Sequence, residues 1–194
     1  MNIWGILKLV VASVAFVVLI TFLTVEPPKQ NSNAKSILQD MPKTVQLVGD
    51  EKLQYNTNSI INKNSIIFVG NSQTMGVAKS LLSLFPKQLK NLVVVSNISD
   101  APWFLKEYQE YDNQNRLKGN DTTPWIFDKD GSMRSFLKVP TSNPLSYFVY
   151  SVQDDQEVKL IYQYSFTQLL EDRKLDQIEV EKSLQELKNI LENK

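Results

Sequence analysis

Residues 65–85 read SIIFVGNSQTMGVAKSLLSLF, a short apolar run followed by a segment with helical periodicity. The run over 65–70 is rich in β-branched and aromatic residues, which is typical of a buried strand. Apolar residues then recur at helical spacing over 73–85, with Ser72 as the expected N-cap and Pro86 as the helix terminator. The stretch therefore predicts a strand, a tight loop and a helix.

The next elements along the chain are a second strand and a second helix. LVVVSNIS at 92–99 is another β-branched run. A right-handed crossover would place it parallel to the strand at 65–70. The segment 101–111 begins with Pro at a helix-entry position and predicts a helix, and 112–123 is a polar connection.

Three further units complete the pattern. WIFDKDGSMRSFLKV at 125–139 predicts a short strand, an Asp-x-Asp-Gly turn and a short helix. The segments 145–152 and 158–166 predict an antiparallel hairpin, and so does 45–56, with its turn at Gly49–Asp50. This order predicts an α/β fold in which a mixed sheet is flanked by helices.

The N-terminus carries a membrane-span signal. Residues 9–25 form an uncharged apolar run, and a spanning helix needs about 20 mostly apolar residues. A cleaved signal peptide is the alternative, although no small-x-small step follows the run. Lys8 before the run and Glu26 after it favour export of the remaining chain. We therefore expect an uncleaved, single-pass anchor in the inner membrane, with the folded domain in the periplasm.

The chain divides by composition into four parts. Residues 1–26 are expected to form the transmembrane signal anchor, and 27–43, rich in Pro, Asn, Ser and Lys, a linker. Residues 44–175 are expected to form one folded domain. Residues 176–194 predict an amphipathic helix, which would pack on its own domain or pair with a partner.

Composition excludes several kinds of chemistry. The 194 residues include no Cys and no His, so thiol redox chemistry, Ser-His-Asp triads and thiolate or imidazole metal sites are excluded. The 21 basic and 21 acidic residues balance, which argues against nucleic-acid binding. We expect a protein that is not an enzyme and that uses no cofactor and no metal.

The order of the segments resembles the thioredoxin-like redoxin family, which includes peroxiredoxins and periplasmic thiol oxidoreductases. VQLVGDEKLQYN and INKNSIIFVGN are similar to the family's entry hairpin and first central strand. VVVSNISDAPWFLKEY is similar to the second strand and its helix, and WIFDKDGSMRSFLKV to a characteristic insertion. NPLSYFVYSVQDDQEVKLIYQY is similar to the terminal hairpin that follows a cis-proline. The resemblance covers about residues 44–173 and implies a thioredoxin-like fold.

The sequence departs from the family at its reactive site. In redoxins the loop after the first central strand carries the reactive cysteines, and the resemblance places Gln73 and Gly76 at those positions. Pro144 corresponds to the cis-proline, with Pro140 as the alternative. The resemblance implies that this loop and the proline turn form the substrate face, so we expect a cysteine-free partner-binding surface made of Asn71, Ser72, Gln73, Thr74, Asn143 and Pro144.

Two local patterns have competing interpretations. GNSQT, residues 70–74, is similar to a serine esterase block, but Ser72 has no histidine base and fits a helix N-cap better. DKDGS, residues 128–132, imitates the start of a calcium-binding loop. The loop's last position would be Val139 instead of Glu, so a turn with Gly131 at positive φ is expected.

These observations predict a non-catalytic, membrane-anchored binding or scaffold protein of the bacterial cell envelope, with a protein or peptide partner. One alternative is a structural accessory subunit of a membrane machine that acts through its helices. The other is a histidine-free serine hydrolase that uses Ser72.

Overall fold

The computed structural model describes residues 36–85, 89, 91–99, 111–140, 145–169 and 175–192. The chain divides into two compact units, Met1–Asn33 and Ala34–Lys194, and all described residues lie in the second. The predicted anchor at 1–26 lies outside the described residues, as do most of the linker and the predicted helix at 101–111, apart from Tyr111. In the described part of the chain, no helix is both long enough and apolar enough to cross a membrane.

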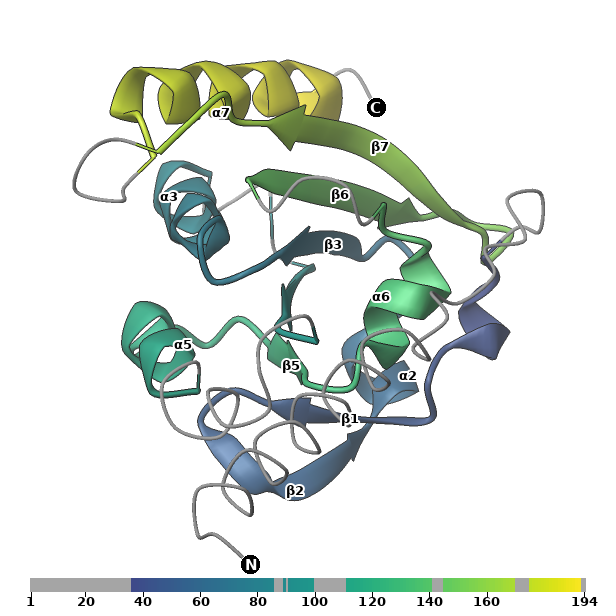
Figure 1. Cartoon of the computed structure of the whole chain (residues 1–194). Helices are drawn as coiled ribbons and strands as arrows, with labels where there is room; N and C mark the ends of the chain where they lie inside the picture. Colours follow the sequence, from purple (N-terminus) through teal and green to yellow (C-terminus); the bar gives the residue numbers. More distant parts are fainter. Residues whose placement is uncertain are drawn as a thin grey trace, which may run out of the picture. The chain divides into compact units, whose positions relative to one another are not determined.

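Within these residues a single sheet organises the domain (Figure 1). In spatial order its seven strands are β2 (Asp50–Asn56), β1 (Thr44–Leu47), β5 (Trp125–Asp128), β4 (Leu92–Asn97), β3 (Ile66–Gly70), β6 (Ser146–Val152) and β7 (Val158–Ser165). Strands β3, β4 and β5 are parallel, and the other neighbouring strands are antiparallel. The mixed sheet of an α/β fold that the sequence predicts is confirmed.

The strand, loop and helix predicted over residues 65–85 lie in the middle of the domain, at strand β3. Strand β3 leads into α3 (Met75–Leu84), and the chain returns to β4, which pairs with β3 in parallel from Ile66↔Leu92 to Gly70↔Ser96. The other side of β3 pairs with β6 in antiparallel register. Four of the five β3 residues are buried, as expected for an apolar central strand covered on both faces.

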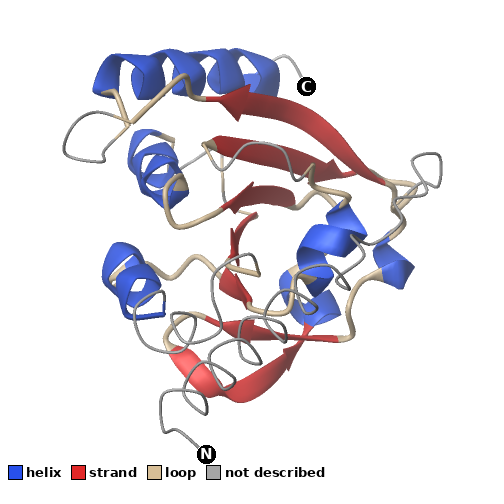
Figure 2. Cartoon of the chain, viewed as in Figure 1, coloured by secondary structure: helices blue, strands red, loops and turns tan. Residues whose placement is uncertain are grey.

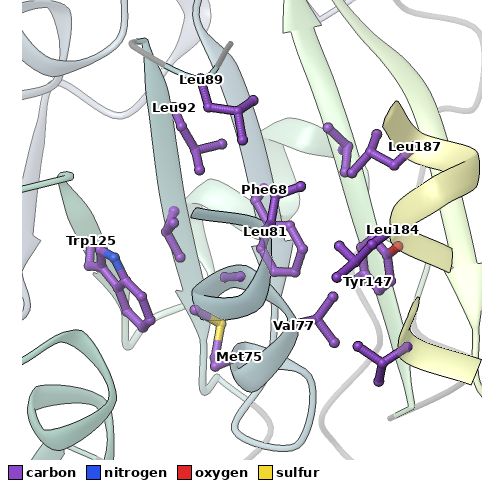
Figure 3. Packing of buried hydrophobic residues seen from close by; sticks show 14 of the residues in the cluster. Phe68, Met75, Val77, Leu81, Leu89, Leu92, Trp125, Tyr147, Leu184 and Leu187 are labelled. Carbon is purple, nitrogen blue, oxygen red and sulfur yellow. The ribbon is translucent and has the colours of Figure 1, made fainter. Parts of the chain in front are cut away.

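Helices cover both faces of the sheet (Figure 2). Helix α3, α5 (Tyr111–Lys118) and α7 (Gln177–Glu192) lie on one face. The short helices α2 (Thr57–Ile60) and α6 (Ser132–Leu137) lie on the other. Buried apolar side chains fill both layers. The α3-side core includes Phe68, Met75, Val77, Leu81, Trp125, Tyr147, Leu184 and Leu187 (Figure 3), and the α6-side core includes Met41, Ile61, Ile67, Val95, Met133 and Leu137.

Helix α7 packs against its own domain. The apolar face of the predicted amphipathic helix is buried: Val180, Leu184 and Leu187 belong to the α3-side core and are 6%, 1% and 0% exposed. The Tyr162 hydroxyl on β7 donates to Ser183 O at 3.1 Å and to the Glu186 carboxylate at 2.9 Å. Of the two possibilities that the sequence left open, the structure shows intramolecular packing.

Three local features differ from the sequence-based expectations. Residues 112–118, expected in a polar connection, continue the helix α5, which buries Gln114 and packs Leu117 on the core. Residues 36–41, expected in the linker, join the domain: Val158 N donates to Ser36 O, and Met41 is buried. The first hairpin turns at Val48 and Gly49, one residue earlier than predicted, because Leu47 pairs with Asp50. Gly49 has φ +94°, which glycine adopts at no steric cost.

Candidate functional site

The loop Asn71–Thr74 at the carboxyl end of β3 is held by reciprocal hydrogen bonds. The Asn71 Oδ1 accepts from Gln73 N at 3.1 Å and from Thr74 N at 3.3 Å. In return, the Thr74 hydroxyl accepts from Asn71 N at 3.0 Å. These bonds, with Thr74 N and Met75 N also donating to Asn71 O at 3.0 Å, close the turn that leads into α3. The prediction of Ser72 as the N-cap is wrong, since α3 begins at Met75 and Thr74 occupies the N-cap position.

The loop lies beside the start of β6. Thr74 is fully buried, and its hydroxyl is 3.4 Å from Ser146 O. Two residues before the loop, Val69 pairs with Phe148. The fold therefore brings the chain immediately after Pro144 next to the predicted face.

The second half of the predicted face cannot be placed. Asn143 and Pro144 lie outside the described residues. Pro140 is described and exposed, and among the described residues no peptide bond is cis. Pro140 therefore does not fit the cis-proline position that the resemblance implies.

The surface of the loop carries no ionisable group. Ser72 and Gln73 are exposed, Asn71 is half-buried and Thr74 is buried. A serine hydroxyl needs a neighbouring base to become a nucleophile, and the chain has no histidine to supply it. The exposed groups can donate and accept hydrogen bonds, so the loop can contact a ligand through neutral polar groups.

Gly70 precedes the loop and Gly76 follows it, and only Gly70 is too crowded to accept a side chain. A Cβ at Gly70 would lie 2.6 Å from the Thr74 hydroxyl and 3.1 Å from the Phe68 ring, whereas a Cβ at Gly76 would meet nothing within 4 Å. Gly70→Ala should cost about 1–3 kcal/mol of unfolding free energy, because Thr74 is fixed by its hydrogen bonds with Asn71. Gly76→Ala should be neutral or stabilising by up to about 1 kcal/mol, because alanine favours a helix. Chemical denaturation of both variants checks this, and equal destabilisation would contradict the loop geometry.

Asp128 and Asp130, at the end of β5, have structural roles. The two Asp128 oxygens accept from Met133 N at 3.0 Å and Arg134 N at 2.9 Å, and Asp130 accepts from Ser132 N at 3.0 Å. Gly131 has φ +77°, so the predicted glycine turn is confirmed. Among the described residues no group of three or more acidic side chains could hold a metal ion.

Burial raises the pKa of the Asp128 carboxyl above its ordinary value, although the N–H groups of Arg134 and Met133 oppose the rise. A raised pKa means that the folded state binds the proton more tightly than the unfolded state. Wild-type stability relative to Asp128→Asn should therefore fall as the pH rises from about 4, the ordinary aspartate value, through the raised pKa. Urea denaturation across this pH range measures the difference, and a pH-independent difference would contradict the assignment.

The aromatic residues that cluster between positions 103 and 127 of the sequence divide into two groups. Trp103, Phe104 and Tyr108 lie outside the described residues. Trp125 and Phe127 are buried on β5 and belong to the α3-side core. These two aromatics are therefore packing residues, and the structure assigns them no place on the exposed loop.

No protein-family model matches the sequence, and no curated protein matches it. Solved structures do resemble the chain. PrxQ of Xylella fastidiosa has a TM-score of 0.47 and 13% identity, covering 82% of this chain and 98% of that one. A secreted Mycobacterium tuberculosis disulfide oxidoreductase homologous to E. coli DsbE has a TM-score of 0.45 and 11% identity, covering 78% and 95%.

A third similar structure is the bacterioferritin comigratory protein of Xanthomonas campestris, with a TM-score of 0.43 and 15% identity over 82% of this chain and 98% of that one. These similar structures are thioredoxin-like redoxins. The present chain contains no cysteine, so its loop Asn71–Thr74 lacks the reactive thiol of a redoxin.

Sequence reasoning placed the loop correctly between β3 and α3 but missed how the loop is held. Asn71 and Thr74 are the residues that fix its shape, through the bonds described above. The signal available in the sequence was an Asn-x-x-Thr spacing, in which each side chain can reach the N–H of the other residue. Gly70, whose Cβ would collide with Thr74, is the other requirement.

Proposed function

We propose that this chain is a non-catalytic, membrane-anchored binding or scaffold protein of the bacterial cell envelope. Its partner would be a protein or peptide that docks on the face formed by Asn71–Thr74 and the Asn143–Pro144 turn. The observation that carries the proposal is the cysteine-free loop Asn71–Thr74, which is closed by hydrogen bonds between Asn71 and Thr74 and lies beside the start of β6. Such a loop offers amide, hydroxyl and backbone groups in a fixed geometry.

The mode of binding follows from those groups. An extended peptide can add hydrogen bonds to exposed backbone without any covalent step. Gln73 and Ser72 are the exposed side chains nearest to such a peptide. A fixed loop loses little conformational entropy on binding, which favours a specific complex even where the contact area is small.

The proposed location rests on the N-terminal sequence. The apolar run at 9–25 would anchor the chain in the inner membrane, with Lys8 on the cytoplasmic side and the domain in the periplasm. The absence of cysteine suits an oxidising compartment, where a free thiol would be a liability.

A pull-down from solubilised membranes tests the proposal by comparing the full-length wild type with Gln73→Arg and Pro144→Ala. We expect recovery of a specific partner to fall about tenfold with Gln73→Arg, because a long charged side chain would project from the face. The control Lys159→Gln changes an exposed residue of β7 and should leave recovery unchanged. Equal recovery with all variants would contradict the proposed face, and labelling of Ser72 by a fluorophosphonate would instead favour the hydrolase.

A further inference from the structure

A second candidate binding site lies between α3 and the end of α5, and it does not depend on the proposed function. It is a cavity of about 480 Å³. Its lining includes Lys79, Leu82, Leu89, Lys118, Thr122 and Thr123. The lining combines apolar, hydroxyl and cationic groups, as small-molecule sites commonly do.

Local structure explains why these side chains converge. Lys79, Leu82 and Ser83 are spaced by three and four positions on α3 and so lie along one side of that helix. Helix α5 ends at Lys118, and Gly119, with φ +56°, reverses the chain. The reversal carries Thr122 and Thr123 to the cavity wall.

Two lysines, Lys79 and Lys118, supply the cationic groups of this site. Within the described residues, neither of them forms an ion pair. The one carboxylate in the lining, Asp121, is engaged in its own turn: its Oδ1 accepts from Thr123 N at 2.9 Å. The lining therefore carries more positive than negative charge, which favours an anionic ligand.

The floor of the cavity has the opposite character. Leu89 is 5% exposed, and Leu82 is partly buried against the α3-side core. A hydrated inorganic anion gains no binding free energy from the apolar side chains of Leu82 and Leu89. An anion with an attached organic group can bury apolar surface against them. The combined chemistry points to a ligand with a charged head and an apolar portion.

We propose that this cavity binds a phosphate ester, with Lys79 and Lys118 contacting the phosphate and Leu82 and Leu89 contacting its organic portion. Lysine is a common phosphate ligand because it supplies a compact positive charge with three donors. Thr122 and Thr123 add hydroxyl donors at the wall. A phospholipid headgroup and a soluble phosphate ester share this chemistry, and the experiment below separates these two sources.

The test uses the full-length chain in phosphatidylcholine nanodiscs and follows the backbone amide signals of Thr122 and Thr123 by NMR. One arm adds glycerol phosphate, a second adds inorganic phosphate, and a third replaces part of the lipid with phosphatidylglycerol. Each arm compares the wild type with Lys79→Gln/Lys118→Gln. The matched control is Lys52→Gln/Lys159→Gln, which makes the same charge change on exposed strand residues.

We expect saturable shifts with glycerol phosphate or with phosphatidylglycerol, and the responding arm identifies the source. Each lysine beside an anionic headgroup strengthens binding by a factor of roughly five, so Lys79→Gln/Lys118→Gln should bind roughly twenty-five-fold more weakly. The control should bind as the wild type does. No saturable shift in either arm, equal weakening in both double variants, or equal affinity for inorganic phosphate would overturn the proposal.

Discussion

Replacing both Leu184 and Leu187 with alanine should leave the domain unfolded under conditions in which the wild type is folded. Both side chains lie in the α3-side core, at 1% and 0% exposure, and Leu184 lies next to Tyr147 (Figure 3). A buried Leu→Ala change costs about 2–5 kcal/mol, because apolar burial is lost and a cavity remains. The two sites are neighbours, so their effects need not add, but the pair should lose more than about 4 kcal/mol of a total stability near 5–15 kcal/mol.

The matched control is Leu53→Ala/Leu84→Ala, which makes the same chemical change at residues that are 54% and 55% exposed. These exposed changes should alter the unfolding free energy by about 1 kcal/mol or less. Circular dichroism during urea denaturation measures both pairs. Similar stability for the two pairs would mean that α7 does not pack as described.

The same packing bears on the accessory-subunit alternative. Deleting residues 176–194 would remove α7 and expose the α3-side core, so we expect an unfolded domain rather than a folded domain that has lost a partner. A loss of complex formation after this deletion would therefore say nothing about a contact made by α7. Exposed positions of the helix, such as Glu181 and Gln185, are the suitable sites for testing such a contact.

A Gln73→Cys/Gly76→Cys variant should acquire a reactive dithiol. Gln73 lies in the turn that leads into α3, Gly76 is the second residue of the helix, and a Cβ at Gly76 has open space around it. This turn is closed by a bond from Met75 N to Asn71 O, so side chains three positions apart across it are near enough to be joined by a disulfide. The partial positive charge of the helix N-terminus should lower the thiol pKa at position 73 below about 8.5.

The control pair Lys182→Cys/Gln185→Cys has the same spacing in the middle of α7, where both residues are exposed. Its thiols should keep a pKa near the ordinary value of about 8.5, because no helix terminus is nearby. The pH dependence of thiol alkylation measures both pairs. Equal pKa values would show that the loop lacks the electrostatics expected at a helix start.

The elements that could be predicted from the sequence are those with a clear hydrophobic run or a clear hydrophobic periodicity. The runs Ile66–Val69 in β3 and Leu92–Val95 in β4 are apolar without interruption, so strand type and parallel pairing followed directly. The hairpin β6–β7 was equally clear, since two aromatic-rich runs flank a polar turn. The apolar stripe of α7 also matched the residues that are buried.

The elements that were missed depend on tertiary contacts. Helix α5 reads YDNQNRLK, with so few apolar residues that no periodicity is visible, and its packing through Leu117 is a tertiary effect. Met41 was assigned to a linker because the sequence around it is polar, yet the fold buries it in the α6-side core. The N-cap position of Thr74 was missed because Ser72 is an equally acceptable capping residue when only local preference is considered.

We propose that the loop Asn71–Thr74 contacts a partner without thiol chemistry. The most direct test places a photo-crosslinking amino acid at Gln73 of the full-length chain in its native membrane, with the same group at Gln163 on exposed β7 as the control. We expect a discrete crosslinked species from position 73 that is absent from position 163 and is lost when an excess of unlabelled wild-type chain competes. No discrete product from position 73, or the same product from both positions, would contradict the account.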